Sequence, residues 1–213
     1  MPITKHNDAK LNRGSGLTTA RIENLSDGVF SIAMTLLVLN FRVPQMGAAK
    51  LSETMISLWP NLASYFLSFI ALGTFWIGHH NQFHWIRHSD RRFLWINITF
   101  LASIVLIPFS TTVLGTYRGQ QLAVMIYGVN LLTCALLLVY HWHYATHGHR
   151  LISASLSHAI IQRIAKRIRV LALLYLVALL CSFVVVWMSV ILVLITQAVA
   201  IIPSRTDELF IRD

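Results

Sequence analysis

No charged residue interrupts the sequence from Val170 to Ile202, a run of 33 residues. As a single helix rising 1.5 Å per residue it would be about 50 Å long, whereas the hydrocarbon core of a bilayer is roughly 30 Å thick. We therefore expect two membrane-spanning helices joined by a tight turn near residues 187–189, because Trp187 suits the headgroup region. One long tilted helix is the alternative.

Further apolar stretches precede this one. The chain is 56% hydrophobic and 12% charged, whereas soluble domains carry roughly 25% charged residues. We expect an all-α integral membrane protein with six transmembrane helices per chain. These helices should cover about residues 22–42, 53–79, 93–115, 120–142, 165–186 and 188–202. They would form one domain over residues 21–202, between a flexible cytoplasmic N-terminus (1–20) and a cytoplasmic C-terminal tail (203–213).

The lysines and arginines are distributed unevenly between the expected loops. If the N-terminus is cytoplasmic, only Arg42, Lys50 and Arg118 fall outside, and the other fourteen of the 17 fall inside. This asymmetry follows the positive-inside rule and supports an even number of spans with both termini in the cytoplasm. It also accounts for the net charge of +9 through topology and contact with membrane lipid. No nucleic-acid partner is therefore expected.

The first apolar helix carries charged residues that a plain membrane anchor would lack. Arg21 and Glu23 suit an interfacial position, but Asp27 lies at least one turn further in, and an ionisable group within a membrane helix suggests function. At 100° per residue, Ile32, Leu36 and Leu39 share one narrow stripe. Thr35 flanks this stripe, Arg21 projects onto it near the cytoplasmic end, and Asp27 projects to the opposite side.

The second helix ends in a group of residues that could hold Asp27. It runs inward and ends with Trp76, followed by His79, His80 and Asn81. A carboxylate that accepts a hydrogen bond from an imidazole lowers the burial cost of both groups. We expect Asp27 and Ser26 to contact His79 or His80 and so fix the orientation of the first helix.

The run R-x-x-x-L-S-D-G, formed by Arg21, Leu25, Ser26, Asp27 and Gly28 and followed by an apolar helix, resembles the signature of the transmembrane protein 175 family of potassium channels. Leu25 stands where that family has Phe, and it fills less volume in the motif. The segment 76–81 resembles the W-x-x-H-H element of the family's second helix. The segment 107–111 (IPFST) resembles the P-F-x-T element of its third helix.

The resemblance implies six helices per repeat and, for prokaryotic single-repeat members, a homotetramer in the plasma membrane. The first helices of four subunits would line a potassium pore. Its hydrophobic filter would consist of rings of Ile32, Leu36 and Leu39, with Thr35 as a nearby hydroxyl ring. These are the residues that the helical projection places on and beside one stripe. A hydrophobic constriction offers no ligand to an ion, so the filter would favour potassium, which holds its water less tightly than sodium.

Two other functions remain open at this point. The histidines of segment 141–149 could hold a metal or a haem, although no Cys or carboxylate joins them. A secondary transporter would be expected to show internal repeats and matched broken helices, and no repeat is visible. Apart from the permeant potassium ion, we expect no cofactor and no metal. No acidic pair in a plausible intramembrane site and no Gly-rich phosphate loop indicates an enzyme.

Overall fold

The computed structural model is all-helical over the residues that it describes, which are 19–39, 55–56, 58–153 and 155–202. The expected N-terminal and C-terminal tails therefore lie largely outside the described residues. The main helices are α1 (Thr19–Leu39), α3 (Trp59–Trp85), α4 (Arg91–Val105), α5 (Ile107–Thr116), α6 (Gln121–Thr146), α7 (His158–Cys181) and α8 (Val186–Ile201). A short 3₁₀ turn, η2 (His147–His149), follows α6.

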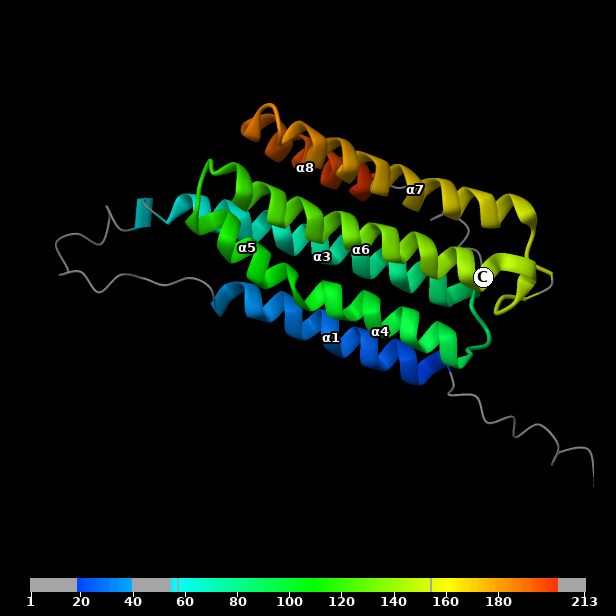
Figure 1. Cartoon of the computed structure of the whole chain (residues 1–213). Coiled ribbons are helices and arrows are strands. Elements are labelled where there is room, and N and C mark those ends of the chain that lie inside the picture. Colours follow the sequence, from blue (N-terminus) through cyan, green and yellow to red (C-terminus); the bar gives the residue numbers. More distant parts are fainter. Residues whose placement is uncertain (1–18, 40–54, 57, 154, 203–213) are drawn as a thin grey trace, which may run out of the picture.

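The helices lie side by side in one elongated bundle (Figure 1). Helix α1 forms one edge, where it packs against α3, α4 and α5. Helices α7 and α8 form the opposite edge and pack against each other, with α7 also covering α6. The middle of the bundle is filled by large buried side chains such as Phe75, Phe100, Tyr127 and Trp142. Helix α1 is thus held by its own protomer on one side only.

The expected third span, 93–115, is observed as two helices, α4 and α5, that meet at Leu106. Pro108 stands in the first turn of α5 and has no backbone N–H with which to continue the α4 ladder. Asn130 on α6 donates a hydrogen bond to the carbonyl of Ser103 (2.9 Å) and accepts one from Ser110 Oγ (2.9 Å). A neighbouring side chain therefore satisfies a backbone group beside the interruption, as is usual in membrane helices.

Within the described residues, four helical segments are long and apolar enough to cross a membrane: Thr19–Leu39, Trp59–Trp85, Arg91–Thr116 and Gln121–His149. Helix α8 is apolar but shorter. Helix α7 begins at His158, earlier than the expected 165, because Ser157 caps it by accepting from the backbone N–H of Ile160 (3.4 Å). The basic segment from Arg163 to Arg169 is thus part of α7 itself, which continues without a break into the apolar run.

The turn between α7 and α8 lies at residues 182–185, before the expected 187–189. Ser182 ends α7 by donating its hydroxyl hydrogen to the carbonyl of Leu179 (2.6 Å), and its own carbonyl accepts from Gln121 (3.0 Å). Trp187 therefore belongs to the first turn of α8. Two helices connected by a tight turn replace the alternative of one long tilted helix.

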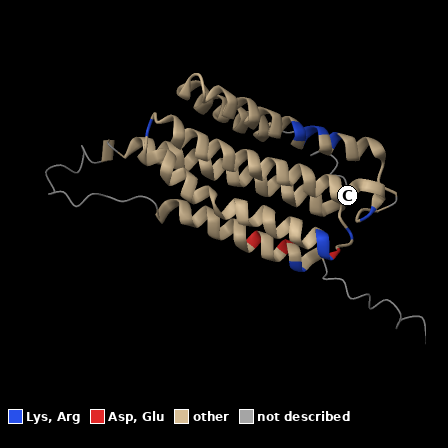
Figure 2. Cartoon of the chain, in the orientation of Figure 1, with Lys and Arg blue, Asp and Glu red and all other residues tan. Residues whose placement is uncertain are grey.

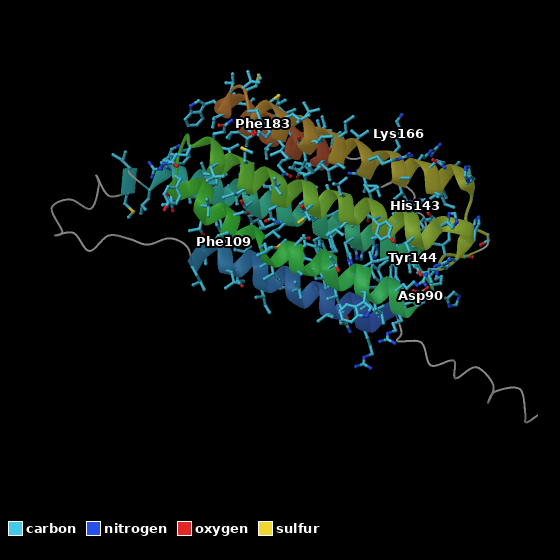
Figure 3. The ribbon with its side chains drawn as sticks, viewed as in Figure 1. Asp90, Phe109, His143, Tyr144, Lys166 and Phe183 are labelled. Carbon is cyan, nitrogen blue, oxygen red and sulfur yellow. The ribbon has the colours of Figure 1, made fainter. Side chains whose placement is uncertain are left out.

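Most of the charged side chains of the described chain gather at one end of the bundle, where α3 ends and α4 and α7 begin (Figure 2). Arg118 lies at the other end, between α5 and α6. At the end that carries most of the charges, Asp90 caps α4 by accepting a hydrogen bond from the backbone N–H of Phe93 (2.8 Å). Its second carboxylate oxygen accepts from the Tyr144 hydroxyl (2.7 Å), and Figure 3 shows both side chains at this end.

Candidate functional site

Helix α1 has two different faces. The buried face packs against the protomer through Ile22, Ser26, Phe30, Ala33 and Leu37. The stripe expected from the helical projection lies on the other side, where Ile32 is 60% exposed, Leu36 37% and Leu39 72%. Thr35 is also exposed, and its hydroxyl donates to the carbonyl of Ile32 (2.8 Å). The protomer therefore turns all four candidate pore residues away from its own core.

The exposed face of α1 is unusually polar for a helix at the edge of an apolar bundle. Besides the stripe it presents Arg21, Asn24, Gly28, Ser31 and Thr35. Helix α8, at the opposite edge, buries its polar residues Ser189, Thr196 and Gln197, and the side chains that it exposes are apolar. Polar residues within membrane helices almost always face protein or a water-filled cavity. The outer face of α8 thus suits lipid, whereas that of α1 suits other protein or water.

Ser26 is connected to His79 through a residue that the sequence analysis missed. Asn97 on α4 donates to Ser26 Oγ (3.3 Å) and accepts from His79 Nε2 (2.8 Å). Ser26 in turn donates to the carbonyl of Ile22 (2.8 Å). All three side chains are buried, so this chain of hydrogen bonds ties α1, α4 and α3 together inside the bundle. The sequence did contain a signal for this role, because the amide of Asn97 lies within the apolar run WINITF. Amide side chains in such runs commonly form hydrogen bonds between membrane helices.

Asp27 does not contact either histidine through a hydrogen bond, which corrects the expected arrangement. Its carboxylate accepts from the indole N–H of Trp76 (2.8 Å), and the Trp76 ring stacks on His80 with 5.6 Å between ring centroids. Successive helical residues point about 100° apart, so Asp27 leaves the buried face on which Ser26 lies. Trp76 and His80 lie on the exposed side of α3, whereas His79 is buried.

The motif residues thus form two separate contacts between α1 and its neighbours. The inner contact contains Ser26 and His79 with Asn97, and the outer contact contains Asp27, Trp76 and His80. Asn81 is half-buried on α3. Gly28 is exposed, and a Cβ there would meet nothing within 4 Å, so close packing within the protomer does not explain the glycine.

A second buried histidine lies next to the inner contact. His141 Nδ1 is 2.6 Å from Gln82 Oε1, and Gln82 donates to the carbonyl of Leu138 (3.0 Å). The rings of His141 and His79 have centroids 5.5 Å apart. In the described part of the chain, no group of three or more His, Cys, Asp or Glu side chains is arranged to hold a metal ion. His141 therefore forms part of the buried polar core beside His79.

Comparison with known proteins places this arrangement among channels. The family profile described as endosomal/lysosomal potassium channel TMEM175 matches residues 21–108, the segment that contains α1, α3 and α4. A protein of Chamaesiphon minutus named as a potassium channel is 34% identical over 178 residues, which cover 81% of this chain and 88% of the relative. A potassium channel of Streptomyces collinus is 33% identical over 137 residues, covering 62% of this chain and 66% of the relative.

A solved structure resembles the whole bundle. The crystal structure of a lysosomal potassium-selective channel TMEM175 homolog from Chamaesiphon minutus matches with a TM-score of 0.75 and 33% sequence identity. The match covers 85% of this chain and 95% of that one. The resemblance thus includes both the helix arrangement and the motif helices.

Proposed function

Because the chain belongs to the TMEM175 family, we propose that it is a potassium channel whose pore is lined by the exposed face of α1. The membrane would contain six spans per chain: α1, α3, the α4–α5 pair, α6, α7 and α8. Two relatives that match across most or much of their length are named as potassium channels. The bacterial origin of these relatives supports a prokaryotic plasma membrane.

The polar character of the exposed α1 face is the observation that carries the proposal. A face that combines Ile32, Leu36 and Leu39 with Thr35 and Ser31 is costly against lipid. It is favourable where several copies of α1 surround a water-filled path. One helix cannot enclose a pore, so the path requires a closed symmetric oligomer. We infer a homotetramer, the assembly that the family resemblance implies.

Within that pore, the three apolar residues would form successive rings at different depths. Ile32 and Leu36 are one turn apart, and Leu39 follows about one turn further. Rings of this kind narrow the path without supplying ligands, so an ion passes only if it sheds or deforms part of its hydration shell. The loss of hydration water costs less free energy for potassium than for sodium. Thr35 would place a hydroxyl beside the narrow region and offset part of the cost.

The orientation in the membrane follows from the charges. The end at which α4 and α7 begin carries most of the described lysines and arginines (Figure 2), so by the positive-inside rule it faces the cytoplasm. Helix α1 then enters the membrane from the cytoplasmic side with Arg21. With six spans, both ends of the chain lie in the cytoplasm.

Potassium flux into proteoliposomes tests the channel, and reversal potentials in mixed potassium and sodium test the filter. We expect Ile32→Asn and Leu36→Asn each to lower the preference for potassium, because an amide ring lets a hydrated ion pass. Ile191→Asn is the matched control, since Ile191 is an exposed apolar residue of α8. Unchanged selectivity in both α1 variants would overturn the assignment of the filter, and absence of flux in the unaltered protein would overturn the channel.

A further inference from the structure

No acidic residue lies between Asp90 and Asp207, the part of the sequence that contains α6, α7 and α8. The first part of α7 nevertheless carries Arg163, Lys166, Arg167 and Arg169 within seven positions. No carboxylate of α6, α7 or α8 can therefore neutralise this cluster, and Figure 2 shows the cluster on α7 well away from the acidic residues of α1.

Arg169 is the cation of this group that borders a cavity. Its Nε donates to the carbonyl of Ala165 (3.0 Å) and its Nη2 to Gln162 Oε1 (3.4 Å). Both acceptors are neutral and belong to α7, so they hold the guanidinium in place without cancelling its charge. Arg167 points elsewhere and donates to the carbonyl of Ala200 on α8 (3.1 Å). Arg169 is also the last charged residue before the uncharged run of residues 170–202.

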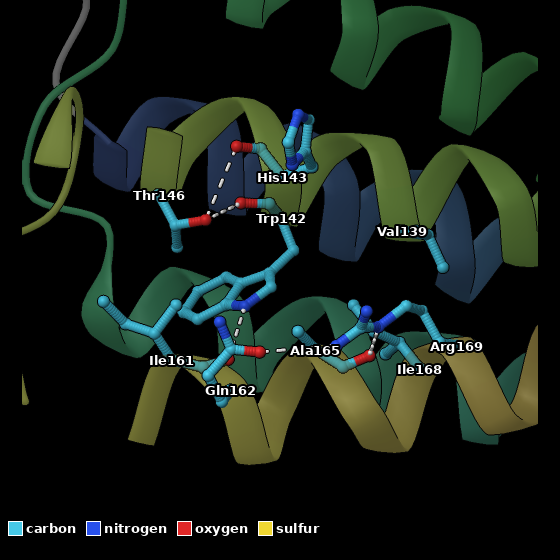
Figure 4. Close-up of a pocket in the computed structure, with 9 residues that line it drawn as sticks. All are labelled: Val139, Trp142, His143, Thr146, Ile161, Gln162, Ala165, Ile168 and Arg169. Carbon is cyan, nitrogen blue, oxygen red and sulfur yellow. Dashed lines mark hydrogen bonds between the residues drawn. The ribbon is translucent and has the colours of Figure 1, made fainter. Parts of the chain in front are cut away.

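The cavity lies between α6 and α7 and has a volume of about 190 Å³ (Figure 4). That is roughly six times the 30 Å³ that a water molecule occupies in the liquid, which is enough for a phosphate group and part of a headgroup. Its polar lining comes from His143, Thr146, Gln162 and Arg169, and its apolar lining includes Val139 and Ile168. The Trp142 indole, which donates to the carbonyl of Ile161 (3.2 Å), fixes one wall between the two helices.

We propose that this cavity binds the headgroup of an anionic phospholipid of the cytoplasmic leaflet. The phosphate lies against Arg169, headgroup hydroxyls reach Gln162 and His143, and an acyl chain continues along Val139 and Ile168. A planar guanidinium suits a phosphate because it presents two parallel donors. Basic pockets between helices on the cytoplasmic side are typical sites for anionic headgroups. The inference rests on the membrane orientation given under the proposed function.

Native mass spectrometry of the purified protein, titrated with phosphatidylglycerol or phosphatidylcholine, tests the site. We expect the unaltered protein to retain phosphatidylglycerol in preference, and Arg169→Ala to weaken that binding by roughly tenfold. Arg163→Ala is the matched control, because it removes the same charge from an exposed position of the same helix that does not line the cavity. Equal losses in the two variants would overturn the proposal, as would a lack of preference in the unaltered protein.

A second variant separates the cavity from the charge. Ala165→Leu fills the space beside Arg169 but keeps every cation, so we expect it to weaken phosphatidylglycerol binding as well. Full retention of the lipid by this variant would place the lipid outside the cavity and overturn the proposal. Displacement of the lipid by millimolar inorganic phosphate would also overturn it, by showing a site for the free anion. These readouts do not depend on potassium flux, so a failed flux assay would refute the channel and not the lipid site.

Discussion

Asn97 connects two buried polar side chains that lie on different helices. Its amide lies between Ser26 and His79, and all three are almost fully buried. A buried polar group left without a hydrogen bond costs about 1–3 kcal/mol. Asn97→Leu should therefore lower the free energy of unfolding by an amount of that order, and the melting midpoint of the purified protein should fall.

Thr99→Val is the matched control for Asn97→Leu. Thr99 lies on the same helix but is exposed, and its hydroxyl donates only to the carbonyl of Trp95 in its own helix (2.8 Å). We expect its effect to stay within about 0.5 kcal/mol. If both variants melt alike, the buried chain of hydrogen bonds does not hold α1 in place.

Asp90 makes the stability of the cytoplasmic end depend on pH. Partial burial alone would raise its pKa, but the backbone N–H of Phe93, the Tyr144 hydroxyl and the charge of Arg150 outweigh it and hold the pKa below its ordinary value of 3.8. The folded state thus binds fewer protons than the unfolded state between the two pKa values. The stability contributed by the Asp90 charge is fully present above about pH 4 and is lost as pH falls through the folded pKa.

Melting curves of the unaltered protein and of Asp90→Asn should show this dependence. We expect a constant difference between their midpoints from pH 8 to pH 5, and a smaller difference below pH 4, where the Asp90 carboxylate of the unfolded state takes up a proton before that of the folded state does. A difference that stays constant down to pH 3 would contradict the assignment. Tyr144→Phe removes one of the hydrogen bonds to Asp90 and should show a smaller effect in the same pH range.

At the scale of single residues, the sequence identified the motif residues correctly but not the side chains to which they bond. The motif around Asp27 and the group at 76–81 do meet, but Trp76 supplies the donor where a histidine was expected. Hydropathy and depth show that two helix ends can touch. Only the rotation of each helix about its axis decides which side chains face each other, and that rotation depends on packing across the whole bundle.

At the scale of the helices, the interruption between α4 and α5 is compensated by α6. Pro108 prevents a continuous helix, and Asn130 bonds both the Ser103 carbonyl and the Ser110 hydroxyl on either side of the break. Asn130→Ala should therefore destabilise the protein by about 1–3 kcal/mol. Thr133→Val on the same helix is the matched control, because the exposed Thr133 hydroxyl donates to the carbonyl of Val129 in its own helix (2.8 Å).

Melting midpoints of the two variants test this prediction. We expect the effect of Thr133→Val to stay within about 0.5 kcal/mol. Equal losses in the two variants would show that the bonds of Asn130 to α4 and α5 do not stabilise the bundle.

The helices also show what hydropathy can and cannot locate. Hydropathy identified the apolar part of α7 but placed the start of the helix at 165. An apolar run shows where a helix can contact lipid, but it does not show that the helix also includes the charged region from Arg163 to Arg169. The observed start at His158 depends on a serine cap, a local hydrogen bond that no average over a window reveals. Conversely, the thickness of the bilayer was enough to predict that the 170–202 run forms two helices, because one helix of that length would be too long. The turn between them lies several residues earlier than expected.

For the whole molecule, the polar exposed face of α1 requires partners that a single protomer does not contain. We expect the protein to form a tetramer, so that native mass spectra in mild detergent and in lipid nanodiscs should show a particle of four times the 24.1 kDa chain. A monodisperse monomer or dimer under both conditions would contradict the proposed pore. Ile191→Asn, on the opposite edge of the bundle, should leave the tetramer intact.

The sequence could predict an all-helical membrane protein and the family to which the chain belongs, because both depend on patterns that are local in the sequence. It could also predict that Ile32, Leu36 and Leu39 share a stripe, since this follows from helical periodicity. It could not predict the cavity between α6 and α7 or the burial of His141 beside His79, because these depend on how distant helices are set against each other.

The position of α1 at the edge of the protomer has a consequence for the cell that makes this protein. A subunit that leaves the ribosome and enters the membrane carries only one quarter of the wall of the proposed pore, so it is electrically silent on its own. Partly assembled channels would therefore leave the ionic gradients of the membrane intact during synthesis. In the proposed tetramer, conduction would begin only when the last subunit joins, so that assembly would act as the first gate.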